Sequence, residues 1–251
     1  MSKLHIDLNA DLGEGAGHDD ELLQLVSSAN IATGFHAGDA NTMRTAIAIA
    51  RDRGVAAGAH PSLFDRANFG RKELNVAAEE VYDAVVYQAG VFEAIAEPLG
   101  VKPAHVKPHG ALYNMAARDA ALADAVVRAI KAVNADLLLL APSGSQLELA
   151  AHRLGLGLAR EVFADRNYLA DGALVPRTRP DALLHDPNEA ADRVIQILEH
   201  GTVQSVDGKT VRLVADTVCV HGDTPGAVEF VRALRSRLER AGVAIKSPAA
   251  E

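Results

Sequence analysis

The stretch LHIDLNADLGEGAGHDD, residues 4–20, indicates the fold most directly. Leu4, Ile6 and Leu8 alternate with polar neighbours at a period of two, which predicts a β-strand with one apolar face. The polar neighbours are Asp7, Asn9 and Asp11, and Glu14 follows them. Such a polar face is either a solvated outer surface or a buried surface beside the chemistry of an active site.

Similar apolar runs return along the chain, bounded by Gly, Pro or Asp, and alternate with longer helical patterns. This alternation is typical of βαβα units in a parallel sheet. The predicted strands are 4–10, 29–35, 55–60, 103–108, 137–141, 158–164 and 213–220. The predicted helices lie near 19–28, 41–53, 76–97, 117–134, 143–154, 187–200 and 225–241. Thr224 and Pro225 predict the start of the last helix, and Asp207-Gly208 predicts a hairpin insertion near 203–214.

Size and composition favour one large domain over residues 1–251. Hydrophobic residues make up 49% of the chain and charged residues 23%, so a large core is feasible. The net charge of −8 argues against a nucleic-acid partner or an anionic membrane, both of which bind basic surfaces. No apolar run has the length of a signal peptide or a membrane span. The single cysteine, Cys219, forms no internal disulfide, so we expect a cytoplasmic protein.

Seven parallel strands either close into a barrel or form an open sheet. In a barrel, polar residues converge from many strand ends on one mouth, whereas an open sheet concentrates them at one switch point. Polar side chains follow most of the predicted strands, among them Asp39 after the second and Glu161 and Asp165 around the end of the sixth. This distribution predicts an α/β fold with a single-domain, TIM-like, seven-stranded (β/α)7 barrel.

Four histidines occupy the same position in four of the repeats. His36, His60, His109 and His221 each stand at the end of a predicted strand, within three residues of a Gly or Pro. A single histidine in that position is more often structural than catalytic. Four of them indicate the catalytic face of a parallel barrel.

The barrel also answers the question raised by the first strand. A barrel strand has no edge, so its polar face points inward. Lys107 shares a face of the fourth strand with His109. Because an unpaired buried carboxylate is costly, we expect Asp7 to meet Lys107 or a histidine.

Further candidate side chains lie in loops. The loop SLFDRANFGRKEL, residues 62–74, carries Arg66 and Arg71, which belong either to a solvated surface or to a clamp for a substrate carboxylate. Tyr113 offers a donor from the HGALYN segment, which we interpret as a turn. The sequence lacks a phosphate loop, a dinucleotide-binding glycine pattern, a G-x-S-x-G elbow and a paired C-x-x-C site.

Seven motifs, in the same order along nearly the whole chain, resemble the LamB/YcsF family. They are LNADLGEG, NIATGFHAGD, GAHPS, VKPHGALYN, EVFADRNY, LVPR and VCVHGDT. The resemblance implies a β/α barrel of the glycoside hydrolase/deacetylase type. It also implies the A subunit of an ATP-dependent 5-oxoprolinase, which opens the lactam of 5-oxoproline to L-glutamate with partner subunits B and C. ATP, together with Mg²⁺, is the implied co-substrate of the complex. Thr33 departs from the family pattern, which has Cys there, and Leu63-Phe64 replaces Tyr-Pro.

The implied reaction assigns roles to the candidates. Opening a stable cyclic amide requires an activated carbonyl, a base for water and a cation beside the developing negative charge. We expect Asp11 or His109 to be the base and Lys107 the cation. Arg66 or Arg71 would hold the substrate carboxylate. The other candidates are His60 as a catalytic residue, Asn9, Glu14, His36, Asp39, Tyr113, Asp165 and His221 as substrate-binding residues, and Asp7 and Glu161 in support.

A metal is left unassigned by the sequence. Asp with two His suits zinc or another divalent ion, and the related deacetylase barrels use such a site. Those barrels carry two consecutive aspartates after the first strand, whereas here Leu12 follows Asp11.

Two other functions are compatible with the same residues. One is a metal-dependent carbohydrate deacetylase or other amidohydrolase, although the low aromatic content of 4% with no Trp counts against a sugar site. The other is a non-catalytic scaffold within the complex. The sequence does not identify the chain of the complex that holds ATP.

Overall fold

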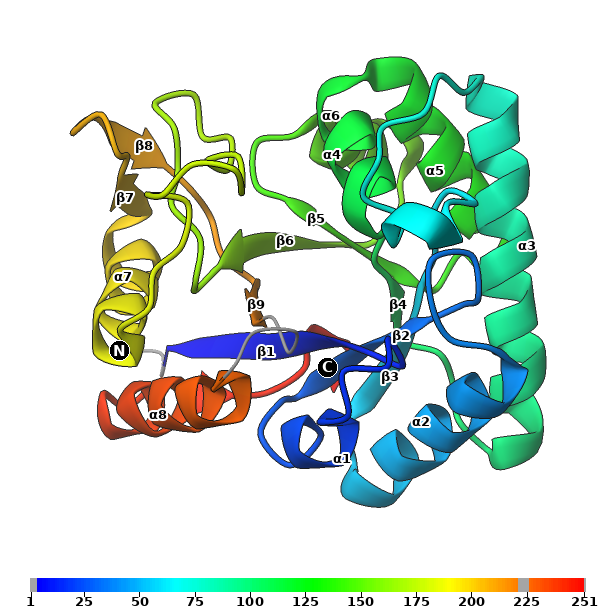
Figure 1. Cartoon of the computed structure of the whole chain (residues 1–251), viewed down its shortest axis with the longest axis horizontal. Coiled ribbons are helices and arrows are strands. Elements are labelled where there is room, and N and C mark those ends of the chain that lie inside the picture. The colour runs from blue at the N-terminus through cyan, green and yellow to red at the C-terminus, as the bar shows by residue number, and fades with distance from the viewer. Residues whose placement is uncertain (1–3, 221–225, 251) are drawn as a thin grey trace.

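The computed structural model describes residues 4–220 and 226–250 and has seven parallel strands in a closed ring (Figure 1). The order of pairing is β1-β2-β3-β4-β5-β6-β9, and β9 pairs back onto β1. The ring consists of β1 (His5–Leu12), β2 (Ser28–Ala32), β3 (Ala56–His60), β4 (His105–Val106), β5 (Leu138–Pro142), β6 (Leu158–Phe163) and β9 (Thr217–Val220). The predicted seven-stranded β/α barrel is confirmed.

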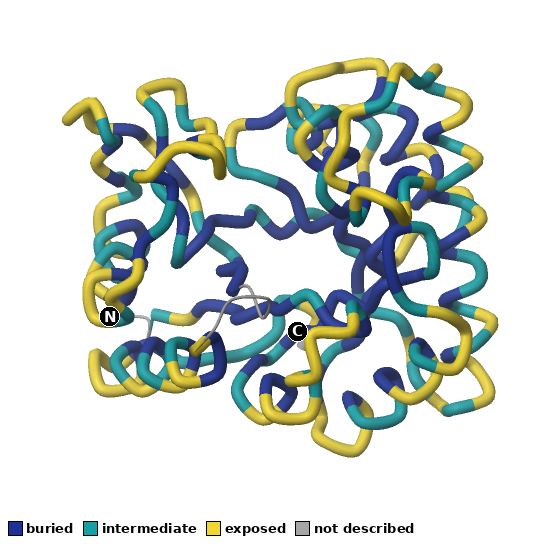
Figure 2. Tube along the Cα trace, in the orientation of Figure 1, coloured by how far each residue is buried: buried dark blue, intermediate teal, exposed yellow. Residues whose placement is uncertain are grey.

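Helices cover the outside of the barrel, and their outer surfaces are exposed while the strands are buried (Figure 2). The α-helices are α1 (Asp19–Leu22), α2 (Ala40–Arg53), α3 (Ala78–Ala96), α4 (Gly110–Arg118), α5 (Ala120–Val133), α6 (Gln146–Leu154), α7 (Pro187–His200) and α8 (Ala227–Arg240). Short 3-10 turns are η1 (Arg66–Asn68), η2 (Glu97–Leu99) and η3 (Pro248–Ala250). None of the helices within the described ranges is long and apolar enough to cross a membrane.

Alternate side chains of β1 point to opposite sides of the barrel wall. The even-numbered residues from Ile6 to Leu12 are fully buried in the apolar core between barrel and helices. Asp7, Asn9 and Asp11 point into the barrel, where they contact side chains of β2, β6 and β9 and of the segment after β4. The polar face of the first strand is therefore buried, as the closed barrel predicts.

The helical region after β4 differs from the prediction. Two helices, α4 and α5, replace the single helix expected over 117–134, and HGALYN opens α4 instead of forming a turn. The Asp119 carboxylate accepts hydrogen bonds from the backbone N–H groups of Ala121 and Leu122, so it caps α5 and ends α4. Sequence periodicity missed this break because apolar spacing continues through both segments.

Several other predicted elements are shorter than expected. The helix predicted over 19–28 covers only Asp19–Leu22. The fourth strand is limited to His105–Val106 between two prolines, which cannot donate to a sheet ladder. Thr224 and Pro225 lie outside the described residues.

Three short strands of the described residues lie outside the ring. An antiparallel hairpin joins β7 (Thr202–Gln204) to β8 (Thr210–Arg212) around Asp207-Gly208. β10 (Ala244–Ile245) pairs with the start of β1 and was not predicted, because two residues carry no recognisable periodicity.

Candidate active site

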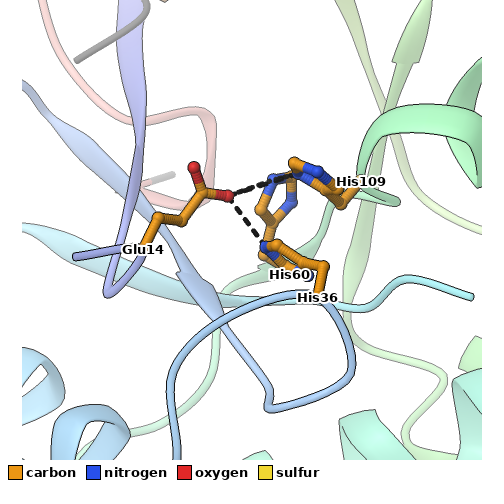
Figure 3. Close-up of side chains that lie close together, drawn as sticks. All are labelled: Glu14, His36, His60 and His109. Atoms are coloured by element: carbon orange, nitrogen blue, oxygen red, sulfur yellow. Dashed lines mark hydrogen bonds and ion pairs between the residues drawn. The ribbon is translucent and has the colours of Figure 1, made fainter. Parts of the chain in front are cut away.

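One carboxylate and three imidazoles meet at the C-terminal ends of four neighbouring strands (Figure 3). Glu14 follows β1, His36 follows β2, His60 ends β3, and His109 lies between β4 and α4. One potential ligand atom from each lies within 4.8 Å of the others. We call these four residues the tetrad. The strand-end position that suggested His36, His60 and His109 thus places them in one cluster.

His60 and His109 are held by backbone carbonyl groups. The Nδ1 atom of His60 lies 2.6 Å from the Lys107 carbonyl oxygen, and Nε2 of His109 lies 2.9 Å from that of Phe69. A carbonyl oxygen only accepts, so each of these nitrogens carries the proton. The remaining nitrogens, His60 Nε2 and His109 Nδ1, face each other at 3.0 Å.

Glu14 and His36 complete the cluster. Glu14 Oε1 lies 2.8 Å from His36 Nε2 and 3.2 Å from His109 Nδ1. Burial works to raise the pKa of Glu14, but hydrogen bonding to His109 and His36 outweighs it and lowers that pKa to about 2. Burial lowers the pKa of His36 to about 4, although Glu14 opposes this. The ring of His36 stacks on that of His109, with centroids 3.8 Å apart.

Lys107 is the central cation of the barrel. Its ammonium lies 3.0 Å from Asp11 Oδ1, 3.0 Å from Glu161 Oε1 and 3.2 Å from Asn9 Oδ1. Burial alone would lower the pKa of Lys107, but Asp11 and Glu161 hold it well above its usual value. The Cys219 sulfur also lies 3.0 Å from Nζ, a contact that the sequence did not suggest. Burial raises the pKa of Cys219 well above its usual value, so this group is a neutral thiol.

Tyr113 and Glu161 form a buried hydrogen-bonded pair next to Lys107. The Tyr113 hydroxyl donates to Glu161 Oε2 at 2.5 Å, and Asn9 Nδ2 donates to Glu161 Oε1 at 2.9 Å. Burial, followed by the charge of Glu161, raises the pKa of Tyr113 well above its usual value. Tyr113 is therefore a neutral donor that orients Glu161 toward Lys107.

The expectation that Asp7 meets Lys107 or a histidine is wrong. The hydroxyls of Ser27 and Ser28 donate to Asp7 Oδ1 at 2.6 and 2.8 Å, and that of Thr217 donates to Oδ2 at 2.5 Å. Asp7 lies one layer below the cation, so hydroxyl groups satisfy it instead. Burial raises the pKa of Asp7 to about 6, although the three hydroxyl bonds lower it.

The raised pKa of Asp7 predicts a pH dependence of stability. The folded-state pKa of about 6 exceeds the ordinary 3.8, so the folded chain binds the extra proton between these values. Its stabilising contribution is complete below pH 3.8 and is lost as the pH rises through 6, by about 3 kcal/mol. Urea unfolding of wild type and Asp7→Asn should therefore give a free-energy difference that falls by most of this amount between pH 4 and 7. The exposed Asp83→Asn should give a constant difference, and a constant difference for Asp7→Asn would contradict the prediction.

Other candidates lie outside the tetrad and the barrel interior. Arg66 donates to the carbonyl oxygens of Gly34 and Gly38, which holds the loop that carries His36. The exposed Asp39 caps α2 by accepting from the Thr42 backbone N–H. Both side chains therefore stabilise the backbone around the loop between β2 and α2.

The remaining candidates have various positions. The Arg71 guanidinium lies 4.9 Å from the centre of the Phe69 ring. Asp165 is partly buried after β6, and its backbone carbonyl accepts from the Leu184 N–H. His221 lies outside the described residues.

The positions that depart from the family pattern have identifiable contacts. Thr33 is buried, and its hydroxyl lies 2.9 Å from Gln88 Oε1 and 3.2 Å from the His60 carbonyl oxygen. It therefore supports the end of β3 beneath the tetrad. Phe64 is 74% exposed and packs edge-on against Phe35, with ring centroids 5.3 Å apart.

Sequence reasoning missed the role of Phe69 and Gly70, which it treated as part of an arginine-bearing loop. Phe69 adopts a left-handed conformation, with φ +56°, and its carbonyl accepts the His109 N–H. Gly70 has φ +64°, and a Cβ there would lie closer than 3.0 Å to Ser62 Oγ, His36 Cβ and His109 Cδ2. The Phe-Gly pair allows the loop to approach two tetrad imidazoles, and its only sequence signal was the glycine.

This close approach predicts a large effect of Gly70→Ala. The added methyl group meets three atoms and the left-handed backbone becomes strained, so we expect unfolding free energy to fall by about 2–4 kcal/mol. Gly208→Ala is the matched control, because Gly208 has φ +73° and a Cβ added there would have nothing within 4 Å. Urea unfolding of both variants separates crowding from backbone strain. Equal losses in the two variants would contradict the proposed crowding.

A cavity lies at the other end of the barrel. It has a volume of about 1200 Å³ and is lined by residues that precede the strands, including Ser27, Gly54 and Ala104. It contains none of the tetrad residues. The convergence of buried ionisable groups therefore places the candidate active site at the C-terminal ends of the strands.

Sequence comparisons find similarity to one protein family along almost the entire chain. The model of the LamB/YcsF family matches residues 6–251. The A subunit of 5-oxoprolinase from Bordetella pertussis is 52% identical over 247 residues, covering 96% of this chain and 98% of that protein. The protein of the same name from Bordetella parapertussis has the same identity and coverage.

Structural comparisons agree with the barrel. The lactam utilization protein from Thermus thermophilus superposes with a TM-score of 0.91 at 44% identity, over 97% of this chain and 99% of that one. A family 4 carbohydrate esterase from Streptomyces lividans superposes with a TM-score of 0.50 at 8% identity, over 96% of this chain and 91% of that one. The second similarity shows a shared fold alone.

Proposed function

The chain belongs to the LamB/YcsF family, and on that premise we propose that it is the A subunit of an ATP-dependent 5-oxoprolinase, which hydrolyses the lactam of 5-oxoproline to L-glutamate. The observation that carries the proposal is the 52% identity, over 96% of this chain, to proteins named as the A subunit of 5-oxoprolinase. The pair of buried Lys107 and partly buried Asp11 at the mouth supports the proposal, because it combines a cation with a carboxylate.

The reaction adds water across the C–N bond of a five-membered ring. The carbonyl carbon gains the oxygen of water, the ring nitrogen gains a proton, and the attacking water loses one. ATP provides activation if the lactam oxygen takes its terminal phosphoryl group and ADP leaves, because the carbon then becomes more electrophilic. Water addition breaks the C–N bond and leaves an acyl phosphate, which a second water hydrolyses to the carboxylate and phosphate.

Lys107 is the group we assign to the oxygen on which negative charge develops. Its ammonium is held in place by Asp11 and Glu161, so it requires no rearrangement during the reaction. Burial strengthens its electrostatic interaction with that oxygen. The cation role expected from the sequence therefore remains our proposal for Lys107.

Asp11 is the group we assign as the base for water. Its side chain keeps 14% exposure at the mouth, and Oδ2 lies 3.4 Å from His60 Nε2. His109 is less suited, because one ring nitrogen donates to Phe69 and the other faces Glu14 and His60. His60 is then a positioning residue, which orients the Asp11 carboxylate when its Nε2 is also protonated.

The partners and the nucleotide belong to the same proposal. The relatives are named as subunits, which supports assembly with further chains, for which we propose subunits B and C. ATP with Mg²⁺ is the proposed co-substrate of the assembled enzyme.

Ligand binding by the isolated chain tests the substrate class. We expect calorimetric titration to detect binding of 5-oxoproline and none of N-acetylglucosamine. A deacetylase would reverse this preference. A non-catalytic scaffold would bind neither ligand, and either result would contradict the proposed function.

A further inference from the structure

We propose that the tetrad of Glu14, His36, His60 and His109 binds one Zn²⁺ ion. The four ligand atoms come from the ends of four strands and lie within 4.8 Å of one another, close enough for one ion (Figure 3). Three nitrogens and one carboxylate oxygen form a ligand set that suits zinc, whereas calcium and magnesium prefer oxygen alone. The argument for zinc uses only the positions of these ligands, so it holds whether or not the proposed lactam reaction is correct.

The protonation pattern leaves a gap that a cation fills. His60 donates through Nδ1 to the Lys107 carbonyl, and His109 donates through Nε2 to the Phe69 carbonyl. In their neutral forms both imidazoles therefore present lone pairs to each other, at a separation of 3.0 Å. Glu14 Oε1 adds negative charge 3.2 Å from His109 Nδ1 and 3.7 Å from His60 Nε2. These three acceptors repel one another unless a proton or a metal lies between them.

The spacing of the ligand atoms favours a metal over a single proton. Ligands about 2.0–2.1 Å from a tetrahedral zinc lie roughly 3.3 Å from one another. Four of the separations within the tetrad are 2.8 Å, 3.0 Å, 3.2 Å and 3.7 Å, which are close to that value. A proton joins only two of the atoms, whereas a zinc ion contacts all four.

Backbone groups around two of the ligands match a metal site. Metal-binding histidines usually donate their second N–H to a carbonyl or carboxylate, which fixes the ring and its tautomer. His60 and His109 both do so, and the Phe69 carbonyl is directed by a left-handed backbone that side chains rarely adopt. His36 Nδ1 is buried and has no hydrogen-bond partner among the described residues, so its ring is held less firmly.

The carboxylate explains how this chain forms a site without a second aspartate after its first strand. Leu12 faces the apolar core, and the chain turns through Gly13 and Gly15, both with positive φ. This turn brings Glu14 back over the barrel mouth. Asp11 remains 3.4 Å from His60 Nε2 and borders the site.

Metal binding by the intact chain tests the proposal without an activity assay. The chain is freed of metal with a chelator and titrated with Zn²⁺ in competition with a chromophoric chelator. We expect one equivalent to bind, and the Co²⁺ form to show the absorption of a tetrahedral site. Glu14→Gln and His109→Ala should weaken binding at least about 10- to 100-fold.

His152→Ala is the matched control, because His152 pairs with Glu148 on the exposed surface of α6. The affinity of the His152→Ala chain for Zn²⁺ should equal that of the wild-type chain. Absence of zinc binding by the wild-type chain overturns the proposal whatever the variants do. Equal binding by wild type, Glu14→Gln and His109→Ala overturns it as well, because the zinc would then lie elsewhere.

Discussion

Lys107→Met is expected to lower kcat for glutamate formation by about 100- to 1,000-fold in the assembled enzyme, with a smaller change in KM. The reason is the position of the ammonium, which is held between Asp11 and Glu161 before substrate binds. Methionine has a similar length and no charge, so the developing negative charge loses its partner. Steady-state kinetics with 5-oxoproline and ATP provide the measurement.

Stability must be separated from catalysis in this variant. Removing Lys107 leaves Asp11 and Glu161 without their cation, which is expected to cost about 3–5 kcal/mol of unfolding free energy. The double variant Lys107→Met, Glu161→Gln restores charge balance, and the Tyr113 hydroxyl can then accept from the new amide. It should be more stable than the single variant and equally inactive.

An exposed lysine gives the matched control. Lys102 lies just before β4, and its side chain is 77% exposed beside Asp136. Lys102→Met should keep wild-type kinetics. Full activity in the double variant would remove Lys107 from the mechanism.

Asp11→Asn is expected to lower kcat by about 100- to 10,000-fold, because an amide cannot take the proton from water. The substitution keeps the shape of the side chain, and Lys107 retains Glu161 as its partner. Unfolding free energy should therefore change far less than in Lys107→Met. The measurement is kcat together with a urea unfolding curve for the same preparation.

Asp83→Asn provides the control for Asp11→Asn, because Asp83 is exposed on α3. It should leave both kcat and stability unchanged. A folded Asp11→Asn enzyme with wild-type kcat would show that the base is another residue.

Much of the fold was predictable because barrel strands repeat a simple pattern. Alternation in the first strand predicted which side chains point inward, and Asp7, Asn9 and Asp11 do so. Strand ends predicted the positions of His36 and His60. These predictions depend on local periodicity and on the parallel direction of the strands, both of which are properties of the sequence.

The contacts between segments were less predictable. The partners of Asp7 are hydroxyls from other strands, and their height in the barrel depends on strand register. The contacts of side chains in loops were the hardest to predict, because the loop backbone decides where each side chain points. Glu14 turns into the cluster, whereas Asp39 caps a helix and Arg66 binds backbone carbonyls.

Backbone groups also escaped prediction. The carbonyl of Phe69 orients His109, yet nothing in the residue type indicates its left-handed conformation. Asp119 separates α4 from α5 through a cap that apolar spacing does not reveal.

The most direct test is glutamate formation from 5-oxoproline by this chain combined with the proposed subunits B and C, in the presence and absence of ATP. We expect glutamate to form only when this chain and ATP are both present, with one ADP produced for each glutamate. Glutamate formation by B and C without this chain, or by the complete mixture without ATP, would contradict the proposed function. So would the absence of glutamate from the complete mixture together with hydrolysis of an acetylated sugar by this chain.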